Sequence, residues 1–178
     1  FCPDVDLLRM SNDLKVSAFG TITFLSGAGA YELGYDGQIL WKTKNDDHSI
    51  NHTFHHHEFT RLSNGRYMGL VAVIVNQDSA AGNIDNVKRK FFPTLSLSSL
   101  KEYDMDGNEV WTWEASKYQR QGDLLTFQRI FDGAAIDLHE NAFYFDERKS
   151  VIYLSLAGID RILKIQYPSG MVLAEYGS

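Results

Sequence analysis

Alternating apolar and polar residues on either side of a glycine turn form the clearest pattern in the chain. The pattern occurs three times, at 31–41, 100–113 and 162–174. In each copy an alternating run meets Asp-Gly or Ser-Gly and then resumes. This predicts a tight antiparallel hairpin with glycine at the position that needs a positive φ. The turn glycines are Gly37, Gly107 and Gly170.

Two further pairs of strand signals, at 59–73 and 142–156, precede the second and third hairpins. Each full unit therefore has four antiparallel strands, and such units in tandem are typical of a β-propeller. The sequence predicts an all-β chain, a single β-propeller segment over 1–178. It would hold the end of one blade at about 15–45, a blade at 54–114 and a blade at 136–178.

About three blades are too few to close a ring, which needs at least four. An incomplete propeller exposes a strand edge and a blade face, and these are normally paired or covered. We therefore expect either an oligomer or the remainder of a longer polypeptide. Four aromatic residues in the hairpins are interpreted as blade packing, namely Tyr31, Tyr103, Trp111 and Trp113.

Composition limits the classes of function that this chain can have. The chain has 23 acidic and 17 basic residues and a net charge of -6, which argues against non-specific nucleic-acid binding. The longest apolar segment, 68–75, has the length of a strand, so no membrane span is expected. The single cysteine, Cys2, cannot form an intrachain disulfide, and an incidental thiol, a bridge to another molecule and a lipid attachment all remain open.

Five of the six histidines fall within ten positions, and the sixth is His139. In an extended strand, alternation would place His55 and His57 on one face and His56 on the other. One interpretation is a solvated polar loop. A second is a metal site, in which Glu58 or Asp47 adds a carboxylate to the imidazoles, although the spacing matches no established ligand pattern. The clustered histidines are His48, His52, His55, His56 and His57.

A third interpretation follows from position along the repeat. His57 lies at the start of one blade and His139 at the start of the next, and equivalent positions in successive blades surround the same central channel. Asn141, two residues after His139, would share its face. Two imidazoles and an amide can bind an anionic group and stabilise charge on oxygen. An imidazole that is neutral near pH 7 can also act as nucleophile or general base.

Four segments carry a resemblance to a known family. His-His-Glu-Phe-Thr-Arg-Leu-Ser-Asn-Gly-Arg-Tyr at 56–67 and Glu-Tyr-Asp-Met-Asp-Gly-Asn-Glu-Val-Trp at 102–111 are the first two. Asp-Leu-His-Glu-Asn-Ala at 137–142 and Asp-Arg-Ile-Leu-Lys-Ile at 160–165 are the others. Together they resemble the aryl-sulfate sulfotransferases, over most of 31–178.

The resemblance implies an exported, periplasmic or extracellular enzyme with a six-bladed propeller when complete. Such an enzyme moves a sulfuryl group from an aryl sulfate to a phenol through a sulfohistidine, without a nucleotide donor or other cofactor. His57, or else His56, corresponds to a supporting histidine of the family. His139 and Asn141 correspond to its His-x-Asn pair.

Two departures accompany the resemblance. Ala157 stands where the family's sulfate-holding arginine is expected, and Arg161 lies four residues later as a candidate substrate-binding residue. The nucleophilic histidine is expected in a later blade, beyond Ser178. The competing prediction is a non-catalytic propeller used for binding or assembly, with a histidine-rich metal site as a variant of it.

Overall fold

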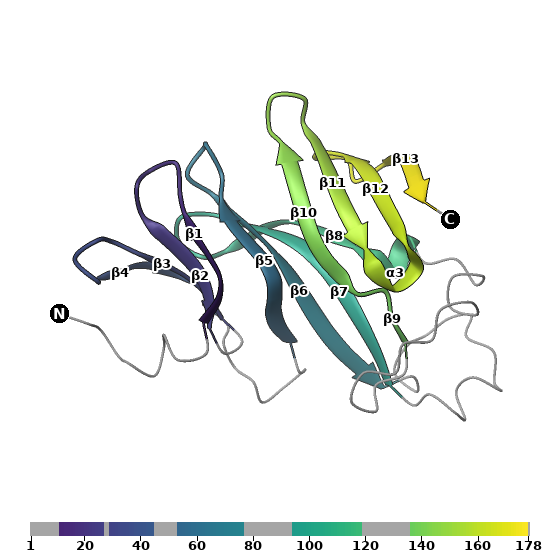
Figure 1. Ribbon diagram of the computed structural model, residues 1–178, viewed down its shortest axis with the longest axis horizontal. Coiled ribbons are helices and arrows are strands. Elements are labelled where there is room, and N and C mark those ends of the chain that lie inside the picture. The colour runs from purple at the N-terminus through teal and green to yellow at the C-terminus, as the bar shows by residue number, and fades with distance from the viewer. Residues whose placement is uncertain (1–10, 27–28, 45–52, 77–93, 119–135, 178) are drawn as a thin grey trace. The chain divides into compact units, whose positions relative to one another are not determined.

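The structure, a computed structural model, describes residues 11–26, 29–44, 53–76, 94–118 and 136–177. Almost all regular structure in these ranges is β-strand, so the all-β prediction is confirmed. The strands form three sheets, coloured purple, blue to teal, and green to yellow in Figure 1. Short helical turns occur at α3 (Ala115–Tyr118) and η1 (Ala157–Ile159).

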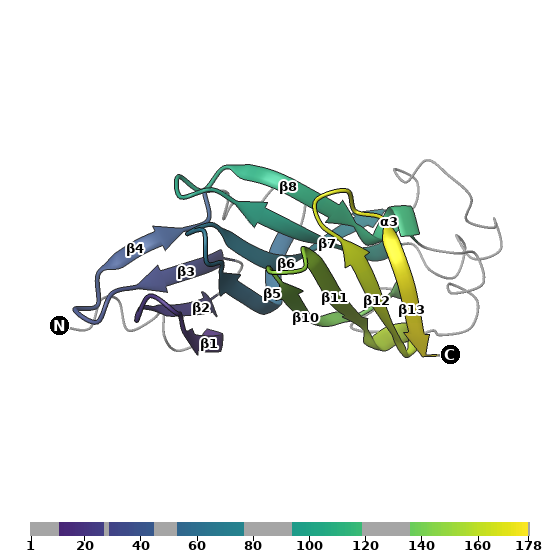
Figure 2. The same ribbon diagram turned by 90° about the horizontal axis from the view of Figure 1, so that it is seen from above.

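Each sheet follows the order of its strands along the chain. The first consists of β1 (Ser11–Val16), β2 (Ile22–Ser26), β3 (Gly29–Leu33) and β4 (Ile39–Lys42). The second consists of β5 (Thr53–Arg61), β6 (Tyr67–Asn76), β7 (Thr94–Tyr103) and β8 (Glu109–Glu114), and β9 (Ile136–Asp137) pairs in parallel with β7. The third consists of β10 (Glu140–Asp146), β11 (Val151–Leu156), β12 (Arg161–Gln166) and β13 (Val172–Gly177), side by side in Figure 2.

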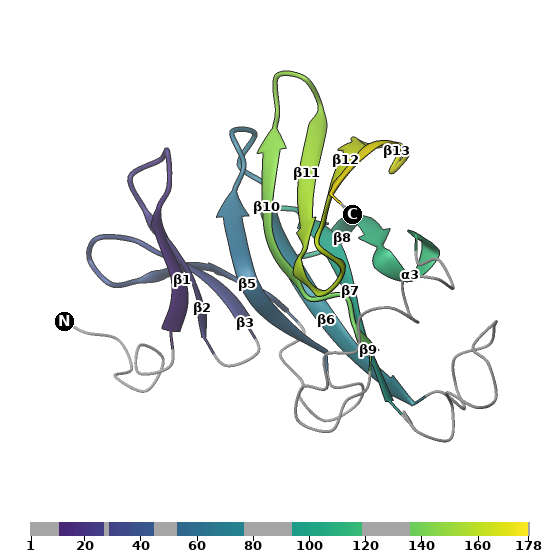
Figure 3. The same cartoon turned by 45° about the vertical axis from the view of Figure 1, so that its right-hand side comes forward.

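The chain divides into two compact units. The first holds the described residues up to Val71 together with Leu100–Trp113, and the second holds Ala72–Ser99 and the described residues from Glu114 onward. In the first unit, β5 lies against β1, β2 and β3, and Figure 3 shows β5 beside them. No helix in the described part of the chain is long and apolar enough to cross a membrane.

The three predicted hairpin turns are confirmed. Gly37, Gly107 and Gly170 all have positive φ, between 75° and 80°. The Gly34 N–H donates to the Gln38 carbonyl at 2.9 Å, and Asp104 and Asn108 repeat this bond in the second sheet at 2.9 Å. Glycine occupies these positions because it reaches the left-handed region without steric cost.

The first sheet is more complete than the sequence suggested. Four strands span 11–42, where the hydrophobic pattern predicted only the end of a blade. The strand that the pattern missed is β1, with the sequence Ser-Asn-Asp-Leu-Lys-Val and a register shift between Asn12 and Lys15. A bulge breaks the period of two on which recognition of a strand depends.

An aromatic cluster fills the core of the first unit. Trp41 of β4 stacks on Tyr67 at 4.0 Å and on Phe59 at 5.5 Å between ring centroids. Its indole N–H donates to the Asp104 carbonyl at 3.1 Å. Tyr103 belongs to the same buried cluster. The packing role predicted for Tyr103 is therefore confirmed, and Trp113 is also buried.

A buried polar network also connects the first sheet with the second. The Glu32 carboxylate, 1% exposed, accepts hydrogen bonds from Arg61 Nη1 at 2.6 Å, from the Tyr67 hydroxyl and from the Thr21 hydroxyl. The Arg61 guanidinium also lies 3.9 Å from the centre of the Phe19 ring. Burial, and next the hydrogen bond to Glu32, raise the pKa of Tyr67 above its ordinary value. The network joins β3, and the residue that precedes β2, to β5 and β6.

Candidate functional site

The histidines at 55–57 lie on β5, the first strand of the second sheet. His55 Nε2 is 3.1 Å from the Tyr103 hydroxyl. The His56 ring contacts Phe54 edge-on, with 5.9 Å between centroids, and contacts His57 at 5.1 Å. Of the three imidazoles, His57 is the exposed one.

The predicted alternation of these side chains is interrupted. His57 has a φ of 57°, in the left-handed region, which a regular strand does not contain. Its ring consequently lies against that of its neighbour His56. The assumption of an unbroken period of two, which paired His57 with His55, is therefore wrong at this position.

His139 immediately precedes β10, the first strand of the third sheet. It has a φ of 52°, and its carbonyl accepts the Ala157 N–H at 3.0 Å. Asn141, which is exposed, falls where the register of β10 shifts between Glu140 and Ala142. The bulge again interrupts regular alternation, so spacing alone does not place Asn141 on the face of His139.

A shared backbone feature singles out the predicted histidines. Among the described residues, five that are not glycine have positive φ, and two of these, Ser150 and Asp160, lie in turns. Of the other three, Asp13 is the third residue of β1, His57 is the fifth of the nine residues of β5, and His139 immediately precedes β10, so each belongs to the first strand of its sheet or adjoins it. Strained backbone of this kind costs about 1–3 kcal/mol and clusters at functional sites.

Asp13 is the member that the sequence did not reveal. Its carboxylate accepts the Phe59 N–H at 2.6 Å and the Lys15 ammonium at 3.0 Å. Lys15 also pairs with Glu58, so one cation bridges carboxylates of β1 and β5. Burial raises the pKa of Asp13, while the hydrogen bonds from Lys15 and Phe59 act in the opposite direction.

Arg161, the predicted substrate-binding arginine, lies at the start of β12. Its Nη1 donates to the Tyr118 hydroxyl at 2.9 Å, and its Nε lies 3.8 Å from Glu175 Oε2. Burial raises the pKa of the Tyr118 phenol, against the lowering effect of the hydrogen bond from Arg161. The guanidinium is thus held within the second unit by an aromatic hydroxyl and a carboxylate.

The structure describes the predicted site in two separate parts. His56 and His57 belong to the first unit, and His139, Asn141 and Arg161 belong to the second. His48, His52, Asp47 and Cys2 lie outside the described residues. Among the residues that are described, no group of three or more His, Cys, Asp or Glu side chains is arranged to hold a metal ion.

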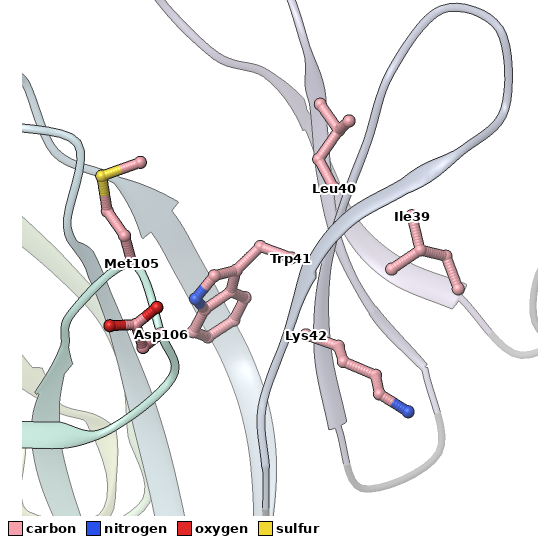
Figure 4. A pocket seen from close by; sticks show the side chains of 6 residues that line it. All are labelled: Ile39, Leu40, Trp41, Lys42, Met105 and Asp106. Carbon is pink, nitrogen blue, oxygen red and sulfur yellow. The ribbon is translucent and has the colours of Figure 1, made fainter.

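An open hollow of about 390 Å³ lies elsewhere in the first unit, between β4 and the turn from β7 to β8. Figure 4 shows the Trp41 side chain pointing toward Met105 and Asp106 there. The lining residues are Ile39, Leu40, Trp41, Lys42, Met105 and Asp106. None of the predicted site residues contributes to it.

Comparison with known proteins leaves the function open. No model of a protein family matches the sequence. No curated protein matches it either. Among solved structures the chain is similar to a protein of unknown function from Bacteroides caccae, with 12% sequence identity and a TM-score of 0.42. The match covers 94% of this chain and 61% of that one, so the chain spans about three fifths of that structure's length.

The left-handed backbone at His57 predicts that glycine is more stable than alanine at this position, the reverse of the usual order. His57→Gly is expected to be more stable than His57→Ala by about 1 kcal/mol, because only glycine adopts this conformation without steric cost. At His56, whose φ is not positive, glycine should instead be less stable than alanine by about 0.5–1 kcal/mol. Urea unfolding of the four variants measures both differences. Equal or greater stability of His57→Ala would contradict the assigned backbone.

Proposed function

We propose that this chain is part of a β-propeller enzyme similar to the aryl-sulfate sulfotransferases. The reaction moves a sulfuryl group from an aryl sulfate ester to a phenolic acceptor, and His57, His139 and Asn141 hold the sulfate oxygens. One observation carries the proposal. His57, within the first strand of the second sheet, and His139, directly before the first strand of the third, both have a left-handed backbone, which is a strained conformation for a residue other than glycine.

Transfer of a sulfuryl group requires hydrogen-bond donors around the sulfur atom. A histidine nitrogen attacks sulfur, the bond from sulfur to the aryl oxygen breaks, and the phenolate leaves with the electron pair. The acceptor phenol then gives its proton to a base, and its oxygen attacks sulfur as the nitrogen–sulfur bond breaks. Imidazole N–H groups and the Asn141 amide can stabilise the charge on the sulfate oxygens in both steps. By the resemblance, the nucleophilic histidine lies in a later blade.

His56 and Arg161 have secondary places in this proposal. The His56 ring packs on His57 and would fix its orientation. Arg161 would supply the positive charge that Ala157 lacks at the position expected for arginine. Its contacts with Tyr118 and Glu175 argue against a fully available guanidinium.

The contacts of Arg161 with Tyr118 and Glu175 favour a second candidate function. In it, the chain is a non-catalytic sheet array that binds aryl sulfates or similar anions without transferring the sulfuryl group. Such a module would keep the imidazole and amide donors and lack the arginine cation that holds sulfate most strongly. The two candidates make different predictions for turnover and the same prediction for binding.

A transfer assay distinguishes them. The assay uses a polypeptide that includes the later blade with the nucleophilic histidine, which the proposal requires. With 4-nitrophenyl sulfate as donor and phenol as acceptor, 4-nitrophenolate release is followed by absorbance and phenyl sulfate by mass spectrometry. His57→Gly and His139→Gly are each expected to lower the rate by about 100-fold or more, the usual effect of losing a donor to developing charge. Ser150→Gly is the matched control, because it makes the same backbone change in a turn, where φ is 51°.

The outcomes separate clearly. Transfer that both histidine variants lose and Ser150→Gly keeps supports the enzyme. Saturable binding of the ester without transfer supports the binding module. Neither binding nor transfer contradicts both candidates.

A further inference from the structure

The hollow in the first unit has two walls that come from neighbouring sheets. Leu40 and Trp41 of β4 form one wall, and Met105 and Asp106 of the β7–β8 turn form the other. Trp41 is buried, whereas Leu40 and Met105 are 53% and 65% exposed. The volume of about 390 Å³ falls within the usual range of ligand sites, roughly 300–1,000 Å³. The hollow is therefore large enough to receive an aliphatic side chain of a partner.

The β7–β8 turn is fastened to the first sheet on both sides of the residues that line the hollow. Before them, the Asp104 carbonyl accepts the Trp41 indole N–H at 3.1 Å. After them, the Asn108 amide oxygen accepts a hydrogen bond from Lys44 Nζ at 2.6 Å. Because these bonds hold the two walls together, the hollow is preorganised, which lowers the entropic cost of binding.

A β-bulge sets the direction of the Leu40 side chain. Three residues of β4, 39–41, lie opposite two residues of β3, 32–33, so Leu40 is the extra residue. Bulges re-aim side chains and are frequent beside functional sites. Both Leu40 δ carbons lie over Gly34, where an added Cβ would come within 3.7 Å of each. The bulge therefore places an apolar side chain at the rim of the hollow, as Figure 4 shows.

The two turns beside the hollow share a sequence pattern. The β3–β4 turn carries Tyr-Asp-Gly at 35–37, and the β7–β8 turn carries Met-Asp-Gly at 105–107. In each turn the aspartate is exposed and follows an exposed large apolar residue. Successive sheets of the first unit thus present an apolar side chain and a carboxylate at the same point of the hairpin.

These carboxylates give the surroundings of the hollow a negative charge. Asp106 lines the hollow, and Asp36 Oδ1 lies against Gly34 beside the Leu40 δ carbons. The Lys42 side chain, in contrast, points to the side of β4 away from Asp106 (Figure 4). A ligand in the hollow would meet an apolar surface with a carboxylate on either side, and charge complementarity favours a ligand with positive charge.

We propose that the hollow binds a peptide segment in which an apolar side chain lies between basic ones. The apolar side chain fills the space between Leu40 and Met105, next to the Trp41 indole, and the basic side chains pair with Asp36 and Asp106. Methionine suits such a wall because its flexible thioether adapts to apolar side chains of different shape. The site is independent of the proposed sulfate site, whose residues do not line the hollow.

Peptide binding is measured on the whole chain, labelled with ¹³C at the methionine methyl groups. The probe is acetyl-Lys-Leu-Leu-Lys-amide, and the control peptides are acetyl-Glu-Leu-Leu-Glu-amide and acetyl-Lys-Ser-Ser-Lys-amide. The Met105 signal, assigned by its loss in Met105→Leu, is expected to move with a Kd of about 1 mM or tighter for the probe and to move little with the controls. The signal of Met171, an exposed methionine beside β13, should stay in place throughout.

Substitutions test each side of the hollow. Asp36→Asn and Asp106→Asn should each weaken probe binding by about 2–5-fold, the range for exposed ion pairs. Leu40→Ser removes part of the apolar wall and should weaken it by about 10-fold. Glu147→Gln removes the same charge from an exposed turn of the third sheet and should bind as the wild type does. All four positions are exposed, and circular dichroism checks that each variant is folded.

The results either support or overturn the proposal. Movement of the Met105 signal that is selective for the probe, and that only the substitutions at the hollow weaken, supports it. A Met105 signal that does not move, or that moves equally with either control peptide, would overturn it. The same holds if the aspartate variants bind as the wild type does or Glu147→Gln binds as weakly as they do, since the net charge of -6 would then explain the attraction.

Discussion

Replacing Arg61 with methionine is expected to destabilise the first unit by about 3–5 kcal/mol, the usual cost of breaking a buried ion pair by removing one partner. The substitution leaves the Glu32 carboxylate, with 1% exposure, without its cation, although the Tyr67 and Thr21 hydroxyls still donate to it. It also removes the guanidinium from the face of the Phe19 ring. Equilibrium unfolding in urea, followed by tryptophan fluorescence, measures the loss.

A second variant shows whether charge is the cause. Glu32→Gln combined with Arg61→Met removes both charges and should recover part of the stability lost in Arg61→Met alone. Lys101→Met is the control, because its pair with Glu109 is solvent-exposed on the Glu109 side and such pairs contribute about 0–1 kcal/mol. A loss below about 1 kcal/mol in Arg61→Met would show that Glu32 does not depend on the pair.

Replacing Trp41 with alanine is expected to cost about 3–5 kcal/mol, the range for large aromatic side chains in protein cores. Trp41 stacks on Phe59 and Tyr67 and contacts Tyr103 at 5.9 Å between ring centroids. Trp41 is therefore the side chain through which β4 packs against the second sheet. Unfolding in urea, followed by circular dichroism, gives the change.

Control variants separate the contribution of the Trp41 ring to stability from that of its hydrogen bond. Trp41→Phe keeps an aromatic ring and loses the bond to the Asp104 carbonyl, so a loss of about 1–2 kcal/mol is expected. Trp111→Ala, at the equivalent position of the second sheet, should cost less than Trp41→Ala because Trp111 is only partly buried. Equal losses for the two alanine variants would contradict the central packing role of Trp41.

The hairpins were predictable because their signal is local. Gly37, Gly107 and Gly170 each follow an alternating run and a turn residue, and the required φ is a property of glycine itself. The completeness of the first sheet was harder to predict because a bulge disrupts β1. Gly20 and Gly65, 45 residues apart, carry an additional repeat signal, since both turn glycines join the first two strands of a sheet.

The candidate site was predictable only in part. The positions of His57 and His139 along the repeat singled them out, but their left-handed backbone is not visible in a hydrophobic pattern with a period of two. Asp13 has the same conformation in the first sheet and belongs to a residue type that tolerates it. The link of Asp13 to β5 through Lys15 and Glu58 arises from packing between sheets, which a linear pattern does not encode.

The central proposal is that His57 and His139 hold the same sulfate ester. Nuclear magnetic resonance of the chain labelled with ¹⁵N at histidine, titrated with 4-nitrophenyl sulfate, tests it directly. His57→Gly and His139→Gly assign the two imidazole signals by their loss. We expect both signals to move with one dissociation constant, while the His55 signal, whose imidazole is engaged with Tyr103, moves little. Signals that stay still, or that titrate with two different constants, would contradict the proposal.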